Sequence, residues 1–175
     1  MFATIYVRNF YLQAALRYEP DIRDKPVALI QEQEKKPVII QLNDAAQSAG
    51  INKGMTPSQA LARCLQVTIK VRERSSETSM QQTLLQFAFT LSPYVEATAP
   101  GIATVQFTDH RNLPDKLTRL IDQLGKCEIE AQAGIAATAD TSFLAAHLAR
   151  PVLQVGDARQ FLSPLPIETL LIDQP

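Results

Sequence analysis

The sequence predicts a mixed α/β fold, in which a split βαβ sheet with its helices on one face carries a small inserted α/β lobe. Three observations indicate this fold. FATIYV, residues 2–7, alternates in hydrophobicity as a strand does. Residues 10–72 hold short strands and helices of their own. After residue 72 the pattern is helix, hairpin, helix, strand and helix, so the chain without its insert has a βαββαβ-like order.

The insert begins with a helix over FYLQAALRYEP, whose aromatic and alanine residues recur at helical spacing and which stops at Pro20. Two β-branched runs, PVALI and PVIIQL, predict strands joined by an exposed polar loop, QEQEKK. Two short helices follow, one with Asn43 or Asp44 at its N-cap and one with Thr56 there. VTIKVR predicts a last strand.

The rest of the chain supplies the main sheet and its helices. A helix is expected from about Ser76 to Leu91, and helices are also expected over NLPDKLTRLIDQL and DTSFLAAHLARP. TAPGIATVQFTD, residues 98–109, predicts a hairpin with a Pro-Gly turn, and CEIEAQAGIAAT and VLQVG predict strands. The hairpin apex, Ala99 to Ile102, carries no charge, hydroxyl group or metal ligand.

The composition is that of a globular protein, since 46% of the 175 residues are hydrophobic and 20% are charged. No apolar run reaches the roughly eighteen residues of a transmembrane helix, and the N-terminal residues lack a signal-peptide pattern. We therefore expect a cytoplasmic protein with no membrane partner. The net charge of −1 lacks the basic excess of proteins that grip DNA by their own phosphate contacts.

Cysteine and histidine are too sparse to indicate a metal centre. Cys64 and Cys127 lie far apart, and His110 and His147 are likewise isolated. Neither pair has a partner at the spacing of zinc ligands or of a Cys-His nucleophile. We therefore expect two buried or half-buried thiols and no metal site built from these residues.

Three stretches resemble the Y-family DNA polymerases, the translesion enzymes. YEPDIRDKPVALI resembles their NP-x-L-R-D-x-P-V-A-V stretch, VIIQLNDAAQSAGINKGMTPSQALARC is similar to their fingers motif, and AGIAATADTSFLAAHLARP is similar to their G-I-A helix. Within the family, residues 134–150 and 162–170 resemble the ImuB-type group of bacterial mutagenesis proteins in their GIA-T helix and their L-x-x-LP-I-x-x-L ending. The resemblance covers almost the whole chain.

The resemblance implies the palm and fingers of such a polymerase. The palm, a split βαβ, ferredoxin-like sheet, would comprise residues 1–9 and 75–165, and the inserted fingers lobe residues 10–74. Residues 166–175 would begin the thumb or a linker, and we expect the thumb and little finger to lie outside the given sequence. The sequence stops at IETLLIDQP without a further element, which favours a fragment of a longer protein.

In Y-family enzymes, carboxylates on the first strand and on the hairpin hold two Mg²⁺ ions at the incoming deoxynucleoside triphosphate (dNTP). The resemblance places Tyr6, Gly101 and Ile102 at these positions, and Arg8 at a further acidic position. None of the four offers a carboxylate, and an arginine would repel a divalent cation. The resemblance therefore implies no catalytic residue, no metal and no cofactor in this chain, although the family uses Mg²⁺ and dNTP.

Relocated carboxylates are a poor substitute for these ligands. Glu96 and Asp109 flank the hairpin. Antiparallel pairing sets Glu96 opposite Thr104 or Val105, well away from Asp109. We therefore do not expect the two carboxylates to share a metal ion.

The positions that contact the triphosphate also depart from the family. The fingers Tyr and Arg align with Asp44 and Gln47, so those contacts are lost. The aromatic residue that screens the ribose aligns with Tyr11, and the basic residue at the end of the palm helix aligns with Arg150, so both are remnants of nucleotide binding. The alternatives are that Tyr11 packs the junction of the lobes and that Arg150 is a solvated cation at a helix end.

Three cations recur at every second position near VTIKVR. Lys70, Arg72 and Arg74 alternate on one face of the predicted strand, where they would contact phosphates or an acidic partner. The alternative is a solvated edge strand whose charges discourage pairing with another sheet. These three residues are the candidate nucleic-acid contacts of the chain.

The resulting hypothesis is a non-catalytic Y-family polymerase homologue that acts as an adaptor in DNA repair and SOS-induced translesion synthesis. The resemblance to ImuB-type proteins implies a sliding clamp, a replicative-type error-prone polymerase and a RecA-like protein as partners. Contact with DNA would be weak and non-specific. Two alternatives stay open, namely an active translesion polymerase with relocated ligands and a stand-alone protein-interaction module.

Overall fold

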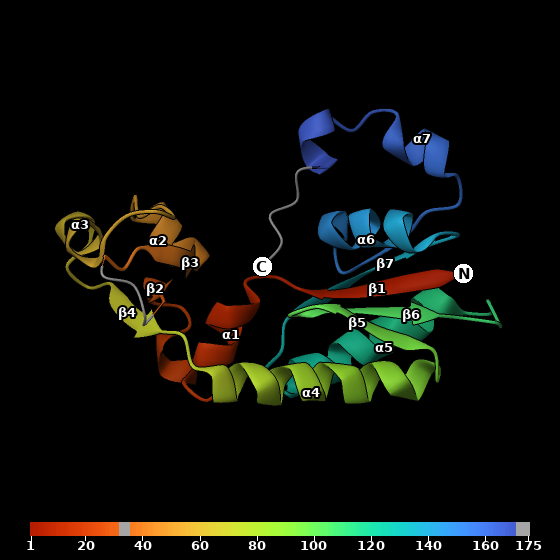
Figure 1. Cartoon of the computed structure of the whole chain (residues 1–175), viewed down its shortest axis with the longest axis horizontal. Coiled ribbons are helices and arrows are strands. Elements are labelled where there is room, and N and C mark those ends of the chain that lie inside the picture. The colour runs from red at the N-terminus through yellow and green to blue at the C-terminus, as the bar shows by residue number, and fades with distance from the viewer. Residues whose placement is uncertain (32–35, 171–175) are drawn as a thin grey trace. The chain divides into compact units, whose positions relative to one another are not determined.

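The computed structural model of the chain describes residues 1–31 and 36–170. The chain forms two compact units (Figure 1). The sheet unit joins Met1–Arg8 to the chain from Met80 onward, and the inserted unit is Asn9–Ser79. The chain therefore leaves the sheet unit after its first strand and re-enters it within α4 (Arg74–Leu91).

The sheet unit contains β1 (Phe2–Val7), β5 (Val95–Ala99), β6 (Ile102–Gln106), α5 (Leu113–Lys126), β7 (Ala131–Ala136) and β8 (Val152–Gln154). Its five strands lie in the order β5-β6-β1-β7-β8. β1 pairs antiparallel with β6 and with β7, and β8 runs parallel to β7. With α4 and α5 as connections, the first four strands along the chain make the predicted split βαβ arrangement, so the fold class is confirmed.

One face of this sheet is covered by α4 and α5 (Figure 1). Side chains alternate between the faces of a strand, so Ala3, Ile5 and Val7 of β1 share one face, and all three are buried. α5 packs by the apolar stripe that the sequence predicts. The buried members of that stripe are Leu113, Leu117, Leu120, Ile121 and Leu124.

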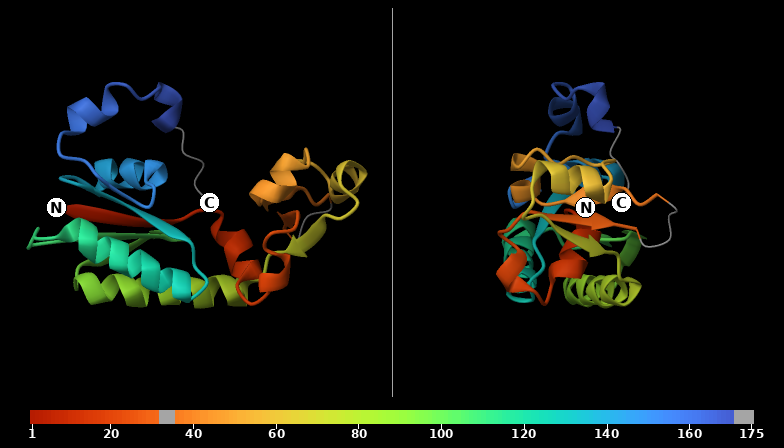
Figure 2. Two further views of the ribbon diagram at one scale, coloured as in Figure 1. Left: turned by 180° about the vertical axis from the view of Figure 1, so that it is seen from behind. Right: turned by 90° about the vertical axis from the view of Figure 1, so that its left-hand side faces the viewer.

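The opposite face carries α6 (Ala139–Leu148), so the prediction that the helices lie on one face is wrong for this helix (Figure 2). The hydroxyl groups of Thr4 on β1 and Ser142 on α6 share a hydrogen bond of 2.8 Å. The reason is steric, because α4 and α5 already cover the first face and the second face offers small residues. A Cβ at Gly134 of β7 would lie only 2.2 Å from the backbone nitrogen of Ala146.

The chain continues from β8 into α7 (Ala158–Leu162) and the 3₁₀ helix η2 (Ile167–Leu170). Phe161 of α7 packs against a small buried cluster formed by Ala136, Ala145 and Val155. Residues 171–175, the rest of the expected thumb or linker segment, lie outside the described residues. No helix in the described part of the chain combines the length and apolarity needed to cross a membrane.

The inserted unit has its own three-stranded sheet, built from β2 (Val27–Ile30), β3 (Ile39–Leu42) and β4 (Thr68–Val71) in the order β3-β2-β4. β2 pairs antiparallel with β3 and parallel with β4. As the sequence predicts, β2 and β3 belong to this sheet and not to the five-stranded one. The predicted exposed loop between them falls largely on residues 32–35, outside the described residues.

The helices of this unit are α1 (Phe10–Leu16), the 3₁₀ helix η1 (Pro20–Ile22), α2 (Asp44–Ser48) and α3 (Pro57–Arg63). Their starts follow the predicted caps. Thr56 caps α3 and forms a capping box with Gln59, and Asn43 caps α2. Strands and helices enclose a core that consists of Ala28, Ile39, Ala46, Ile51, Ala60 and Val67.

Asn43 does more than cap its helix. Its Oδ1 accepts hydrogen bonds of 3.0 Å from the backbone N–H groups of Ala46 and Val27. Its Nδ2 donates to the carbonyl oxygens of Arg23 at 2.9 Å and Lys25 at 2.7 Å. One side chain therefore joins α2, the start of β2 and the turn that precedes β2.

Gly134→Ala should lower the free energy of unfolding by about 3 kcal/mol, because the added methyl group would overlap backbone atoms of α6. Urea unfolding followed by circular dichroism measures the loss. Gly125→Ala is the matched control, because nothing lies within 4 Å of a Cβ at this position. Alanine favours a helix more than glycine does, so this substitution in α5 should raise the free energy of unfolding by up to about 1 kcal/mol. Equal effects of the two substitutions would contradict the close approach of α6 to β7.

Asn43→Ala should destabilise the inserted unit by about 2 kcal/mol, because it removes the cap and leaves further backbone groups without their partner. Hydrogen exchange of the amides in β2 and α2 measures the local effect. Gln47→Ala, an exposed position on the same helix, should change stability by no more than about 0.5 kcal/mol. An Asn43→Ala protein with unchanged exchange would show that these hydrogen bonds are not needed.

Candidate functional site

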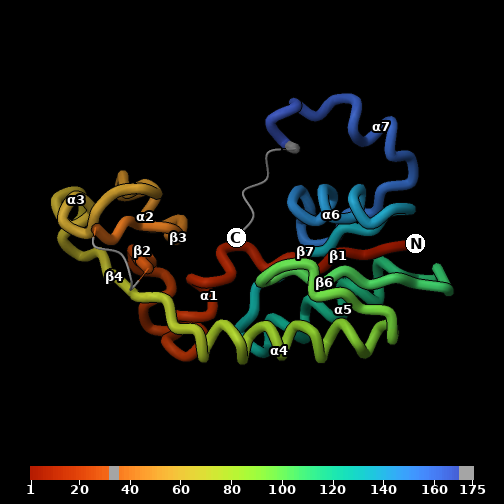
Figure 3. Tube along the Cα trace, viewed as in Figure 1, coloured from red at the N-terminus to blue at the C-terminus, as the bar shows by residue number. Residues whose placement is uncertain are grey.

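The end of β1 meets the turn between β5 and β6. Tyr6 lies directly opposite Ile102 in the register of β1 and β6. The backbone N–H of Val7 donates to the carbonyl oxygen of Gly101 at 2.8 Å. Gly101 has a φ of 74°, the conformation that a Pro-Gly turn requires at its second residue. Tyr6, Gly101 and Ile102 therefore lie together where β1 meets this turn. Figure 3 traces the chain through β1, β5 and β6.

This point offers little to a divalent cation. Ile102 is a fully buried apolar side chain. Gly101 has no side chain, and its N–H donates to Oε1 of Gln81 at 2.8 Å. Burial raises the pKa of the Tyr6 phenol, against a smaller opposing effect of Arg8, so the phenol is neutral near pH 7. Mg²⁺ prefers carboxylate oxygens, so these residues do not fit it.

The two carboxylates that flank the hairpin, Glu96 and Asp109, have other neighbours. Glu96 on β5 pairs opposite Thr104, as expected. Asp109 lies beyond the end of β6 and contacts Nε of Arg111 at 3.1 Å, and this contact lowers the pKa of Asp109. In residues 1–31 and 36–170, no three or more His, Cys, Asp or Glu side chains are grouped so that they could hold a metal ion.

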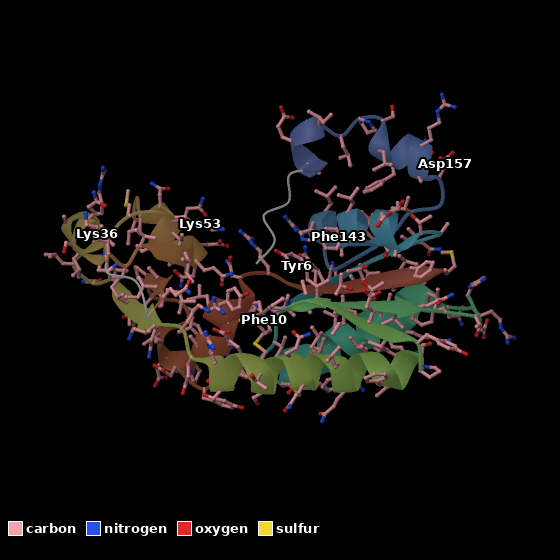
Figure 4. All side chains as sticks on the ribbon, in the orientation of Figure 1. Tyr6, Phe10, Lys36, Lys53, Phe143 and Asp157 are labelled. Atoms are coloured by element: carbon pink, nitrogen blue, oxygen red, sulfur yellow. The ribbon has the colours of Figure 1, made fainter. Side chains whose placement is uncertain are left out.

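Three rings pack together on the α6 side of Tyr6. The ring of Tyr6 stacks on that of His147 of α6, with centroids 4.0 Å apart and planes 27° apart. Phe143, one helical turn earlier, packs against His147 at 4.5 Å, and its carbonyl oxygen lies 2.9 Å from His147 Nδ1. We refer to Tyr6, Phe143 and His147 as the ring clasp; Figure 4 labels Tyr6 and Phe143.

The sequence did not predict the ring clasp, since His147 was expected to be isolated. One signal was available, because Phe143 and His147 are four residues apart and so share one face of a helix. The third ring comes from β1, far away in the sequence. Only the packing of β1 against α6 brings Tyr6 to the other two rings.

In the inserted unit, Tyr11 is buried on α1. The guanidinium carbon of Arg72 lies 3.6 Å from the centroid of the Tyr11 ring, which is a cation–π contact. Arg72 also makes two hydrogen bonds of 2.7 Å to the carboxylate of Glu77, and these raise the pKa of Arg72. The guanidinium group of Arg72 therefore covers one face of the Tyr11 ring.

The prediction that Lys70, Arg72 and Arg74 share one face of a strand is wrong, because only Lys70 lies in β4. β4 ends before Arg72, and Arg74 is the first residue of α4, because the chain has already turned into that helix. Nζ of Lys70 donates to the carboxylate of Glu19 at 2.7 Å, and Arg72 is bound to Glu77. Arg74 is exposed on the first turn of its helix.

The other residues predicted to lie near a nucleotide are exposed. Asp44 and Gln47 lie on α2 of the inserted unit. Arg150 belongs to the sheet unit and follows α6, which ends at Leu148. Its Nη1 donates to the carbonyl oxygen of Ala149 at 2.9 Å. Asp44 and Gln47 therefore lie on the surface of the inserted unit, and Arg150 lies on the surface of the sheet unit.

Curated relatives carry the name DNA polymerase IV. The protein of Citrobacter koseri is 23% identical over 167 residues, which cover 90% of this chain and 48% of the relative. The protein of Yersinia pestis (strain Pestoides F) is 22% identical over 170 residues, which cover 92% of this chain and 48% of the relative. The chain thus spans about half the length of the curated relatives it matches.

Solved structures agree in fold. A post-insertion binary complex of Dbh DNA polymerase superimposes with a TM-score of 0.85 at 15% identity, over 96% of this chain and 52% of that one. DinB from Sulfolobus solfataricus gives a TM-score of 0.81 at 15% identity, over 96% of this chain and 52% of that one. The fold is therefore that of the Y-family DNA polymerases. The model of the impB/mucB/samB family matches residues 5–147, which is most of the sequence, and the chain belongs to this family.

Proposed function

We propose that the chain is a non-catalytic homologue of the Y-family polymerases that acts as an adaptor in DNA repair and SOS-induced translesion synthesis. One observation carries the proposal: Tyr6, Gly101 and Ile102 lie together where β1 meets the hairpin turn. A two-metal transfer of a nucleotide needs several oxygen ligands around both ions. None of these three residues has a carboxylate side chain that could bind such an ion.

The surroundings of the expected nucleotide positions support the same proposal. Asp44 carries a negative charge where the resemblance expects a side chain that binds the triphosphate, and like charges repel. Tyr11 is buried beneath Arg72. Arg150 remains as an exposed cation. A dNTP would therefore meet weaker attraction here than in a polymerase that keeps the family residues.

An adaptor acts through the proteins that it contacts. The ImuB-type pattern in residues 134–150 and 162–170 supports this role and implies a sliding clamp, a replicative-type error-prone polymerase and a RecA-like protein as partners. The net charge of −1 supports a weak and non-specific contact with DNA, because few counterions would be released on binding.

A second candidate function is an active translesion polymerase. The name DNA polymerase IV of the curated relatives favours it. Its metal ions would need carboxylates from residues other than Tyr6, Gly101 and Ile102. Activity that depends on Mg²⁺ separates the two candidates, since only the second one requires such ligands.

The purified protein should not extend a DNA primer in the presence of Mg²⁺ and dNTP, because the family carboxylates are missing. Gel analysis of a labelled primer-template measures extension, with a Y-family polymerase assayed in parallel as the positive control. Extension above the buffer control that disappears on chelation would refute the adaptor proposal and favour the second candidate.

Gly101→Asp serves as the companion variant in this assay. It should stay inactive, because one added carboxylate does not supply the several oxygen ligands that two Mg²⁺ ions require. The left-handed φ of 74° at this position also disfavours a side chain, so folding is checked by circular dichroism. A folded Gly101→Asp protein that extends primers would mean that only this ligand was missing.

DNA binding by the chain should be weak and should depend only shallowly on salt. Titration of labelled primer-template at roughly 50 mM and 200 mM salt should give dissociation constants weaker than about micromolar at the higher salt. Arg74→Ala and Arg150→Ala should weaken binding and lower the salt slope by about one each. Lys70→Ala should have a smaller effect, because Lys70 is already paired with Glu19. Tight binding at the higher salt would contradict a weak contact.

A further inference from the structure

The neutral form of His147 is the one that the ring clasp accommodates. The carbonyl oxygen of Phe143 can only accept a hydrogen bond, so Nδ1 of His147, 2.9 Å away, carries the proton and donates it. Nε2 is then the unprotonated nitrogen of the ring. It is buried and has no hydrogen-bond partner among the described residues. In the neutral ring, the lone pair of Nε2 is therefore the one polar group of the imidazole that has no hydrogen-bond partner among the described residues.

A second proton on His147 would disturb this arrangement. The new N–H on Nε2 would point into the protein without an acceptor, and the charge would be held away from water. Two effects oppose the disturbance, since a cation is attracted to the face of Tyr6 and is favoured in the last turn of a helix. Burial opposes the charged form and lowers the pKa of His147, with the hydrogen bond to Phe143 as a smaller opposing cause.

We propose that the ring clasp is a proton-sensitive latch between β1 and α6. With His147 neutral, its ring stacks on Tyr6, packs against the tilted ring of Phe143 and joins the strand to the helix. When His147 is protonated, its ring leaves the stack so that Nε2 can be hydrated. The end of β1 that pairs with the Gly101 turn then loses its contact with α6.

The described residues that pair with Tyr6 or contact the ring of His147 include no carboxylate. β1 presents the Tyr6 phenol, and Arg8 beyond it acts on that phenol as a positive charge. β7 presents the uncharged Gln132 opposite Tyr6, and β6 presents the apolar Ile102. Burial lowers the pKa of His147 and the backbone hydrogen bond to Phe143 opposes it, and no charged group contributes to the shift.

The direction of the pH effect follows from this lowered pKa. The ordinary value of a histidine is 6.5, and the folded protein holds His147 below it. As the pH falls through 6.5, the unfolded chain binds a proton at this ring before the folded one does. The stability contributed by the latch is therefore complete at higher pH and is lost as the pH falls below 6.5.

Proton NMR of the imidazole signals tests the latch directly, because the chain contains only two histidines. His110→Phe removes one set of signals and so assigns the other to His147. The His147 signals should titrate with a midpoint below 6.5, and the ring signals of Tyr6 should shift with the same midpoint. A midpoint at or above 6.5, or Tyr6 signals that do not follow it, overturns the proposal.

Melting temperatures provide a second test, measured from about pH 7 to about pH 5, where histidine changes its charge. His147→Phe keeps a ring in the stack but cannot titrate, so its melting temperature should fall less than that of the unsubstituted protein. His110→Phe, at an exposed position, is the matched control and should fall as much as the unsubstituted protein. Equal falls in all three proteins overturn the latch.

One variant keeps the test decisive if His147→Phe does not fold. Tyr6→Leu removes the stacked ring and admits water to His147. The NMR midpoint of His147 should then rise towards 6.5 relative to the unsubstituted protein. An unchanged midpoint overturns the proposal, because it would show that the stack does not control the protonation of His147.

Discussion

The pairing of β1 on both of its edges is the constraint on which the sheet unit depends. β6 and β7 determine its register from the two sides, with Tyr6 opposite Ile102 and Thr4 opposite Gly134. A shift by one residue would exchange the two faces of the strand and turn the bulky Ile5 towards α6, where the close approach at Gly134 leaves no room. The same register that builds the core therefore also decides that Tyr6 faces α6.

The position of Tyr6 and the packing of the core thus both follow from the register of β1. In the family that the chain resembles, the meeting point of the first strand and the hairpin carries metal-binding carboxylates, and here it carries Tyr6, Gly101 and Ile102. Glycine at position 134 lets α6 approach β7 closely enough for His147 to stack on Tyr6. A packed cluster of rings lies on this side of β1, and the proposed loss of metal chemistry rests on the lack of carboxylates at Tyr6, Gly101 and Ile102.

Much of the fold could be predicted from local sequence. The alternation of residues 2–7, the Pro-Gly turn at Gly101 and the caps at Asn43 and Thr56 reflect backbone preferences over a few residues, and each is confirmed. The assignment of palm and fingers, and of each residue to a role in them, stays a prediction from the resemblance.

The sequence by itself determined the elements and their order, because these depend on residue type and short-range periodicity. Only the tertiary structure decided that α6 covers the opposite face, that Lys70 and Arg72 are bound to carboxylates, and that Tyr6 and His147 stack. These features arise mainly between residues that are far apart in the chain. Their contacts depend on which faces pack together, and no local pattern specifies that choice.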